Sequence, residues 1–73
     1  MYRITGYIEK DTETGLYVGF VPGIRGAHTQ AETLDELQSN LKEVVELCLE
    51  EMDPESRKHL PEFVGIQQME VAS

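Results

Sequence analysis

The sequence predicts a small two-layer α+β domain in which one long helix packs on one face of an antiparallel sheet. Two short amino-terminal segments alternate apolar and polar residues, which is typical of half-buried strands. Residues 34–52 repeat apolar side chains at helical spacing. We expect the order strand, strand, strand, helix, strand. Residues 1–73 should form a single domain, because the length leaves no room for a second core.

The first two strands are predicted over residues 2–10 and 16–21, where the apolar residues alternate. The polar residues 11–15 between them end in Gly15, which suits a hairpin turn. Gly19 interrupts the second strand and allows another backbone or side chain to approach closely. The apolar residues that share a face are Tyr2, Ile4 and Ile8 in the first strand and Leu16, Val18 and Phe20 in the second.

Pro22 and Gly23 end the second strand in a turn, because the Pro-Gly pair favours turn geometry over continued pairing. Gly26 follows after a short interval, and a third strand is predicted over residues 27–31.

The helix predicted over residues 34–52 begins with a capping box. The hydroxyl of Thr33 can accept a hydrogen bond from the amide of Glu36, and the Glu36 carboxylate can return to the Thr33 amide. Cys48 lies on the apolar stripe of this helix, which indicates a buried, unreactive thiol. The stripe consists of Leu34, Leu37, Leu41, Val44, Val45, Cys48 and Met52.

Asp53 and Pro54 end this helix, since proline has no amide hydrogen and disfavours helix at the residue before it. The same pair can begin a short second helical turn through Lys58, with Asp53 as its cap. Pro61 then introduces a last predicted strand over residues 62–71. Its apolar phase changes between Val64/Ile66 and Met69/Val71, which indicates a bulge or a frayed end.

The formal net charge of -8 is confined to residues 32–55, which hold nine acids against Lys42 alone. A surface of this sign repels phosphate backbones, whose affinity for proteins depends on Lys and Arg. The composition therefore argues against direct binding of nucleic acid.

The composition also excludes several classes of protein. No stretch approaches the roughly 18 apolar residues that a membrane span needs. The amino terminus lacks the apolar core of a signal peptide, so we expect a cytoplasmic protein. Cys48 alone cannot form an internal disulfide or frame a zinc site, and no cofactor is predicted. A chain of this size buries only about 60% of its surface, so oligomerisation is the expected source of further stability.

No combination of residues predicts catalysis. His28 and His59 show no metal-ligand spacing to each other or to the cysteine, and Asp11 and Glu13 suit a solvated turn. The glycines around Arg25 match no phosphate-binding motif of useful length. His28 is the better functional candidate of the two histidines, because loops that follow strands often carry binding residues. We expect a protein that is not an enzyme.

The acidic outer side of the helix is the leading candidate for a binding surface. A solvated helix face is the alternative interpretation, but Lys42 can offset little of the repulsion between the glutamates. That repulsion is better explained if a basic partner docks there. The predicted partner-binding residues are Glu43, Glu46, Glu50, Glu51, Arg25 and His28.

The order of residues over positions 4–50 resembles the HicB-like antitoxins. The resemblance rests on the run GLYVGFVPGIRG at residues 15–26, on His28-Thr29-Gln30 and on TLDEL at residues 33–37. It implies a partial ribonuclease-H-like domain that does not cleave nucleic acid. It also implies a protein that binds and masks HicA, a small basic ribonuclease toxin, and that assembles into dimers or tetramers.

The sequence departs from that family in two respects. Full antitoxins carry a carboxy-terminal DNA-binding segment, which we do not expect in this chain, and Ala27 and Ala31 differ from the usual residues. The sequence therefore predicts an antitoxin-like protein that masks a HicA-type toxin. A stand-alone homo-oligomeric HicB-like domain and a vestigial metal-dependent nuclease are the alternatives.

Overall fold

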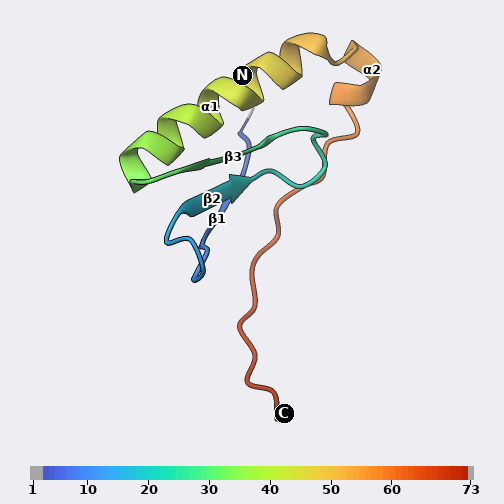
Figure 1. Cartoon of the computed structure of the whole chain (residues 1–73). Helices are drawn as coiled ribbons and strands as arrows, with labels where there is room; N and C mark the ends of the chain where they lie inside the picture. Colours follow the sequence, from blue (N-terminus) through green and yellow to red (C-terminus); the bar gives the residue numbers. More distant parts are fainter. Residues whose placement is uncertain (1–2, 73) are drawn as a thin grey trace.

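The computed structural model describes residues 3–72 and has two layers, a sheet and a long helix that crosses it (Figure 1). The sheet has the order β1-β2-β3, and both neighbouring pairs are antiparallel. The prediction of an α+β protein with three antiparallel strands and one long helix is confirmed. The elements are β1 (Tyr7–Lys10), β2 (Tyr17–Phe20), β3 (His28–Ala31), α1 (Leu34–Glu51) and α2 (Pro54–Arg57).

The strands are shorter than predicted, and β1 begins only at Tyr7. Tyr2, which we expected in the first strand, lies outside the described residues. The predicted hairpin turn is present: the Asp11 carboxylate accepts a hydrogen bond from the amide of Glu13 at 3.0 Å and from the hydroxyl of Thr14 at 3.1 Å. Gly15 closes the turn with a φ of +76°, which side-chain-bearing residues rarely adopt.

Both helices begin at the predicted residues. The hydroxyl of Thr33 accepts from the amide of Glu36 at 3.2 Å, which confirms the threonine half of the capping box. The helix α1 ends at Glu51, one residue before the predicted end. Asp53 caps α2 and Pro54 occupies its first turn, as expected. Local capping chemistry is therefore sufficient to place these helix starts.

Two glycines allow α1 to approach the sheet closely. A Cβ atom at Gly19 would lie 3.2 Å from Leu41 Cδ2 and 3.4 Å from Leu37 Cδ1, and one at Gly6 would lie 2.8 Å from Leu41 Cδ2. These positions confirm the expectation that Gly19 admits a close neighbour. Leu37 is fully buried as a result, and the helix rests directly on the backbone of β2.

The core lies between the second half of α1 and the loop that joins β2 to β3. Val21, Ile24 and Ala27 from this loop pack against Leu41 and Val45 of the helix. The thiol of Cys48, which we expected in the core, is only partly buried.

The same loop also fixes the chain after α2. Gly23 has a φ of +86°, and a Cβ atom there would overlap with the ring of Pro61. The turn between β2 and β3 and the segment that follows α2 are therefore packed against each other at this point.

The strand predicted at residues 62–71 is not formed in this structure, where these residues carry no regular secondary structure. The segment leaves the domain in an extended path and ends far from the sheet (Figure 1). Four of its side chains are largely exposed: Val64 at 91%, Ile66 at 75%, Met69 at 70% and Val71 at 79%. Its alternation of apolar residues indicated a strand, but a strand also needs a neighbour to pair with. Residues 3–72 do not supply that neighbour within one chain.

The exposed segment also explains the dimensions of the molecule. The radius of gyration is 14.0 Å, whereas a compact domain of this length would have about 11 Å. The longest principal extent is 43 Å, against 17 Å for the shortest.

We predict that Gly19→Val destabilises the protein by about 1–3 kcal/mol, because the new side chain would push Leu37 and Leu41 away from the sheet. Chemical denaturation followed by circular dichroism measures the change. Gln30→Val is the matched control, since Gln30 is exposed and lies opposite Val18 on the neighbouring strand. This control should leave the free energy of unfolding unchanged or slightly higher. Equal losses in both variants would contradict the proposed role of the glycine.

Candidate functional site

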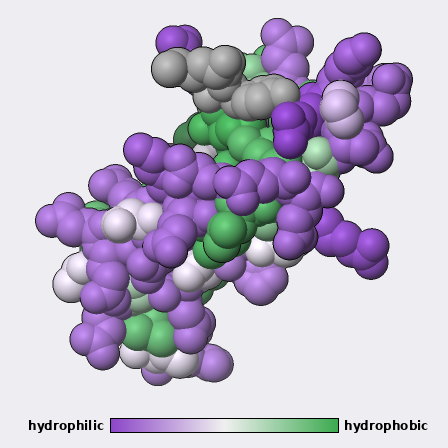
Figure 2. Space-filling view, turned by 90° about the horizontal axis from the view of Figure 1, so that it is seen from above, coloured by the Kyte–Doolittle hydropathy of each residue, from purple (hydrophilic) through white to green (hydrophobic). Residues whose placement is uncertain are grey.

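Three glutamates form the centre of the candidate surface, on the side of α1 that faces away from the sheet. Glu43, Glu46 and Glu50 are exposed, and their spacing of three and four residues makes them neighbours on one face of the helix. The buried residues Leu37, Leu41 and Val45 lie on the opposite face. We call these three glutamates the acidic face. Seen from the helix side, hydrophilic side chains flank a strip of hydrophobic surface (Figure 2).

Leu47 adds an apolar side chain to the acidic face. Its exposed fraction is 56%, and it is a surface neighbour of Glu43, four residues before it, and of Glu50, three residues after it. Sequence reasoning missed this residue because only the charges were considered on the outer side of the helix. The sequence did contain a signal for this residue. Leu47 lies outside the apolar stripe of the helix, so its side chain cannot pack with the other apolar residues of α1.

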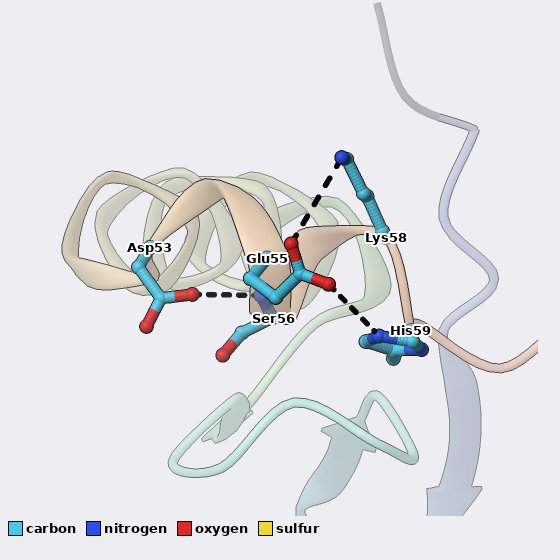
Figure 3. A network of polar contacts seen from close by, with 5 residues as sticks. All are labelled: Asp53, Glu55, Ser56, Lys58 and His59. Atoms are coloured by element: carbon cyan, nitrogen blue, oxygen red, sulfur yellow. Dashed lines mark hydrogen bonds and ion pairs between the residues drawn. The ribbon is translucent and has the colours of Figure 1, made fainter.

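The carboxylates of α1 have no cationic partner in the part of the chain that the structure describes. Between residues 3 and 72, the ion pairs are Lys58–Glu55 at 3.9 Å and His59–Glu55 at 3.5 Å (Figure 3). Both belong to α2 and to the residues just after it, not to the acidic face. Lys42 is exposed on α1, but it forms no ion pair with these glutamates. Within residues 3–72, no ion pair therefore offsets the negative charge of the acidic face.

The other predicted site residues lie elsewhere. Glu51 is exposed but lies about 100° around the helix from Glu50. Arg25 is exposed in the loop between β2 and β3, and its carbonyl oxygen lies 3.6 Å from the thiol of Cys48. The six predicted residues thus do not form one cluster, and the structure brings together only the three glutamates of the acidic face.

His28 lies on the opposite side of the molecule from the acidic face. It begins β3 and stands opposite Phe20, whose ring stacks on Tyr7 at a centroid distance of 5.7 Å. Its neighbour Ala27 is 98% buried toward α1, so the side chain of His28 is directed away from the helix. One protein partner would have to wrap around the domain to contact both His28 and the acidic face.

Arg57 stabilises the carboxyl end of α1, which carries no basic residue in its last turn. Its guanidinium donates to the carbonyl oxygen of Leu49 from Nε at 3.0 Å and from Nη2 at 2.6 Å. A cation at this end of a helix is favourable, whereas the carboxylates of Glu50 and Glu51 are not. Sequence reasoning did not find this contact, because it depends on the chain reversing direction at α2.

Hydrogen bonds lower the pKa of two aspartates at chain turns. The amide of Ser56 donates to the Asp53 carboxylate at 2.7 Å and lowers the pKa of that carboxyl below 3.8 (Figure 3). The amide of Glu13 and then the hydroxyl of Thr14 lower the pKa of Asp11 in the same way. Asp11 belongs to a turn and Asp53 caps a helix, both in contact with solvent. Their hydrogen bonds therefore stabilise the local backbone.

The structure does not assemble a metal centre from the residues it describes. Across residues 3–72, no three His, Cys, Asp or Glu side chains are grouped so that they could hold a metal ion. In the same range, neither helix has the length and apolar character that crossing a bilayer requires.

We predict that Arg57→Met lowers the free energy of unfolding by about 1–2 kcal/mol, because it removes two charge-assisted hydrogen bonds to the end of α1. Lys58→Met is the matched control. Its ion pair with Glu55 is exposed, so that change should stay within about 0.5 kcal/mol. Urea denaturation of the two variants separates the outcomes. Equal effects would mean that the contact of Arg57 with Leu49 is not stabilising.

We predict that the stabilising effect of Asp53 disappears in acid. Its pKa in the folded protein lies below the ordinary value of 3.8, so its contribution is complete above that pH. The contribution is lost as the pH falls through the folded pKa. Thermal melts should show Asp53→Ala less stable than wild type at neutral pH, with a difference that shrinks below pH 3.8. Asp53→Asn keeps an acceptor that does not titrate, so the stability difference between Asp53→Asn and Asp53→Ala should not change with pH. A constant difference between wild type and Asp53→Ala would contradict the assignment.

Sequence comparison places this chain among related proteins of very different organisms. A UPF0150 protein of Synechocystis sp. is 50% identical over 64 residues, which cover 88% of this chain and 87% of the relative. A UPF0150 protein of Thermotoga maritima is 48% identical over 67 residues, with 92% and 87% covered. One of Archaeoglobus fulgidus is 48% identical over 66 residues, with 88% and 87% covered. Neither a family model nor a solved structure matches the sequence. These relatives extend over nearly the whole chain, and the chain belongs to the UPF0150 family.

Proposed function

We propose that this protein is a HicB-like, non-catalytic antitoxin that uses the acidic face of α1 to bind and mask a small basic ribonuclease toxin of the HicA type. One observation carries the proposal. Glu43, Glu46 and Glu50 are exposed on one face of α1 beside the exposed Leu47, and within residues 3–72 no cation pairs with them.

The charge of the acidic face is unfavourable in the isolated chain. Like charges three or four residues apart destabilise a helix by about 0.2–0.5 kcal/mol per pair. No ion pair within the described chain offsets this cost, so the glutamates gain a favourable role only when a second molecule brings cations. A basic ribonuclease has such a surface, because it must bind the phosphates of RNA. Carboxylates placed on that surface would exclude the RNA.

Leu47 gives the proposed interface an apolar contact. Protein interfaces combine a desolvated apolar core with a polar rim, and affinity is concentrated in the core. The exposed side chain of Leu47 lies beside Glu43 and Glu50 at the edge of the acidic face and can supply such a contact. The glutamates would then select a basic partner and speed its association, while the leucine would slow its dissociation.

The observed fold is compatible with a HicB-like domain in its first four elements. Three antiparallel strands followed by one long helix agree with the order that the resemblance implies. We infer that the last strand, and with it the β-β-β-α-β order of a partial ribonuclease-H-like domain, forms only on assembly with another chain. A toxin that acts on messenger RNA would also require this protein to act in the cytoplasm.

The test is binding to the product of an adjacent small basic reading frame, by co-expression and titration calorimetry. We expect Glu46→Gln/Glu50→Gln to weaken the complex roughly tenfold at low salt, because two rim charges are lost. The same variant should make the isolated protein slightly more stable, by about 0.2–0.5 kcal/mol, because the repulsion between neighbouring carboxylates is relieved. The two opposite effects distinguish a binding surface from an ordinary solvated face.

Glu9→Gln/Glu13→Gln is the matched control, because it removes the same net charge from exposed positions outside α1. It should leave the affinity nearly unchanged. Equal weakening by both pairs would mean that only net charge matters. A basic neighbour that does not bind at all would rule out the toxin-masking function.

A stand-alone homo-oligomeric domain is the second candidate function. It is favoured by the apolar side chains of residues 64–71, which the described part of the chain leaves largely exposed. Light scattering of the purified protein distinguishes the two candidates only when combined with the binding test, since an antitoxin of this type would also form oligomers.

A further inference from the structure

The carboxy-terminal segment has the chemistry of a strand without the neighbours of one. Val64 and Ile66 are two residues apart, and so are Met69 and Val71. In an extended chain, the side chains of each pair point to the same side. Their exposed fractions lie between 70% and 91%, and no atom lies within 4 Å of the Cβ position of Gly65. Contiguous exposed apolar side chains of this kind mark an interaction site in a soluble protein. We call residues 64–71 the tail.

The domain has a matching apolar groove on its other side. The helix α1 packs mainly over β3 and β2, so its flank toward β1 is left uncovered. A groove of about 680 Å³ follows this flank. Its apolar lining comes from the strand side and from α1: Ile4, Gly6, Ile8 and Val21, and Leu41, Val45 and Leu49. Gln38, Lys42 and Glu46 of α1 form its polar rim. Ile8 is 41% exposed, although its side chain belongs to the apolar alternation of β1.

The strand β1 also has an unpaired edge next to this groove. Among residues 3–72, β1 pairs with β2 only, in the register that places Ile8 opposite Gly19. An open edge of this kind presents free amide and carbonyl groups and readily accepts an additional strand. An extended segment that pairs with the edge would gain hydrogen bonds, while alternate side chains would enter the groove.

The tail of the same chain starts on the wrong face to fill this groove. Phe63, the residue just before the tail, packs against Tyr7 with a centroid distance of 6.3 Å. Tyr7 stacks on Phe20 on the sheet face away from α1, whereas the groove lies on the helix side. From Phe63 the tail runs away from the domain (Figure 1). A second copy of the chain can therefore receive it more directly than its own domain.

The charges at the groove permit a second copy at this position. The segment from residue 62 to residue 71 carries Glu62 and Glu70 near its two ends, and residues 63–69 between them are uncharged. Lys42 and Glu46 both line the groove and offset each other's formal charge. The uncharged middle of the segment can therefore enter the groove without placing a charge in it.

We propose that the tail of one copy adds as a strand to β1 of a second copy and places its apolar side chains in the groove between β1 and α1, with the reciprocal exchange closing a dimer. This exchange supplies the neighbour that the predicted strand at residues 62–71 lacks within one chain. It involves only Glu46 of the acidic face, which borders the groove, and it does not depend on the existence of a toxin partner.

Light scattering over a range of concentrations tests the proposal with the full chain. We expect the wild type to have twice the chain mass of 8.3 kDa. Val64→Asp/Ile66→Asp should raise the dissociation constant of the dimer by more than about tenfold, because two charged side chains would enter an apolar groove. The fold of this variant should persist, since both side chains are exposed in the single chain. Leu47→Asp is the control, because it adds a charge to exposed α1 surface outside the groove, and it should remain dimeric.

A wild type that stays monomeric at every concentration would overturn the proposal, as would a tail variant that stays dimeric. Paramagnetic relaxation gives the position of the contact. Met69→Cys/Cys48→Ser carrying a spin label is mixed with an equal amount of ¹⁵N-labelled wild type. Amide signals of Tyr7–Lys10 should broaden strongly and those of His28–Ala31 weakly. Broadening mainly at β3 would show that the tail contacts a different part of the second copy, and it would contradict the proposed interface.

Discussion

The contact of Leu37 and Leu41 with the glycine positions of the sheet is the interaction on which the rest of the structure depends. Because Gly6 and Gly19 carry no side chain, the helix lies directly against the backbone of the sheet. This close approach buries Leu37 completely and orients α1 so that its glutamates face solvent. It also places the helix mainly over β2 and β3, which leaves the flank toward β1 open. The acidic face and the groove are therefore two results of one packing contact.

Sequence patterns were sufficient where the information was local. The starts of both helices follow from Thr33, Asp53 and Pro54, and the turn between β1 and β2 follows from polar residues that end in glycine. The strand at residues 62–71 could not be placed correctly, because periodicity reports that side chains need a neighbour but not which molecule supplies it. Nor could Arg57 be recognised, since its contact with Leu49 joins residues eight positions apart around a helix end.

The candidate site was predicted in its composition but not in its geometry. The localised charge identified α1, and helical spacing brings Glu43, Glu46 and Glu50 together. His28 was included because it follows a turn, and only the pairing of β3 with β2 shows that it belongs to the other face of the sheet. Leu47 was absent from the predicted set, because the role of an apolar residue outside the buried stripe can be recognised only when its surroundings on the surface are known.

The packing of Gly23 against Pro61 has a consequence for how this chain can change over time. A side chain at position 23 would overlap with the proline ring, so it could be accepted only if the segment after α2 moved. Positions 23 and 61 therefore constrain each other, although β3, α1 and α2 all lie between them in the sequence. A substitution in a surface turn would redirect a distant end of the chain, and the two positions should vary as a pair in any lineage that retains this exit path.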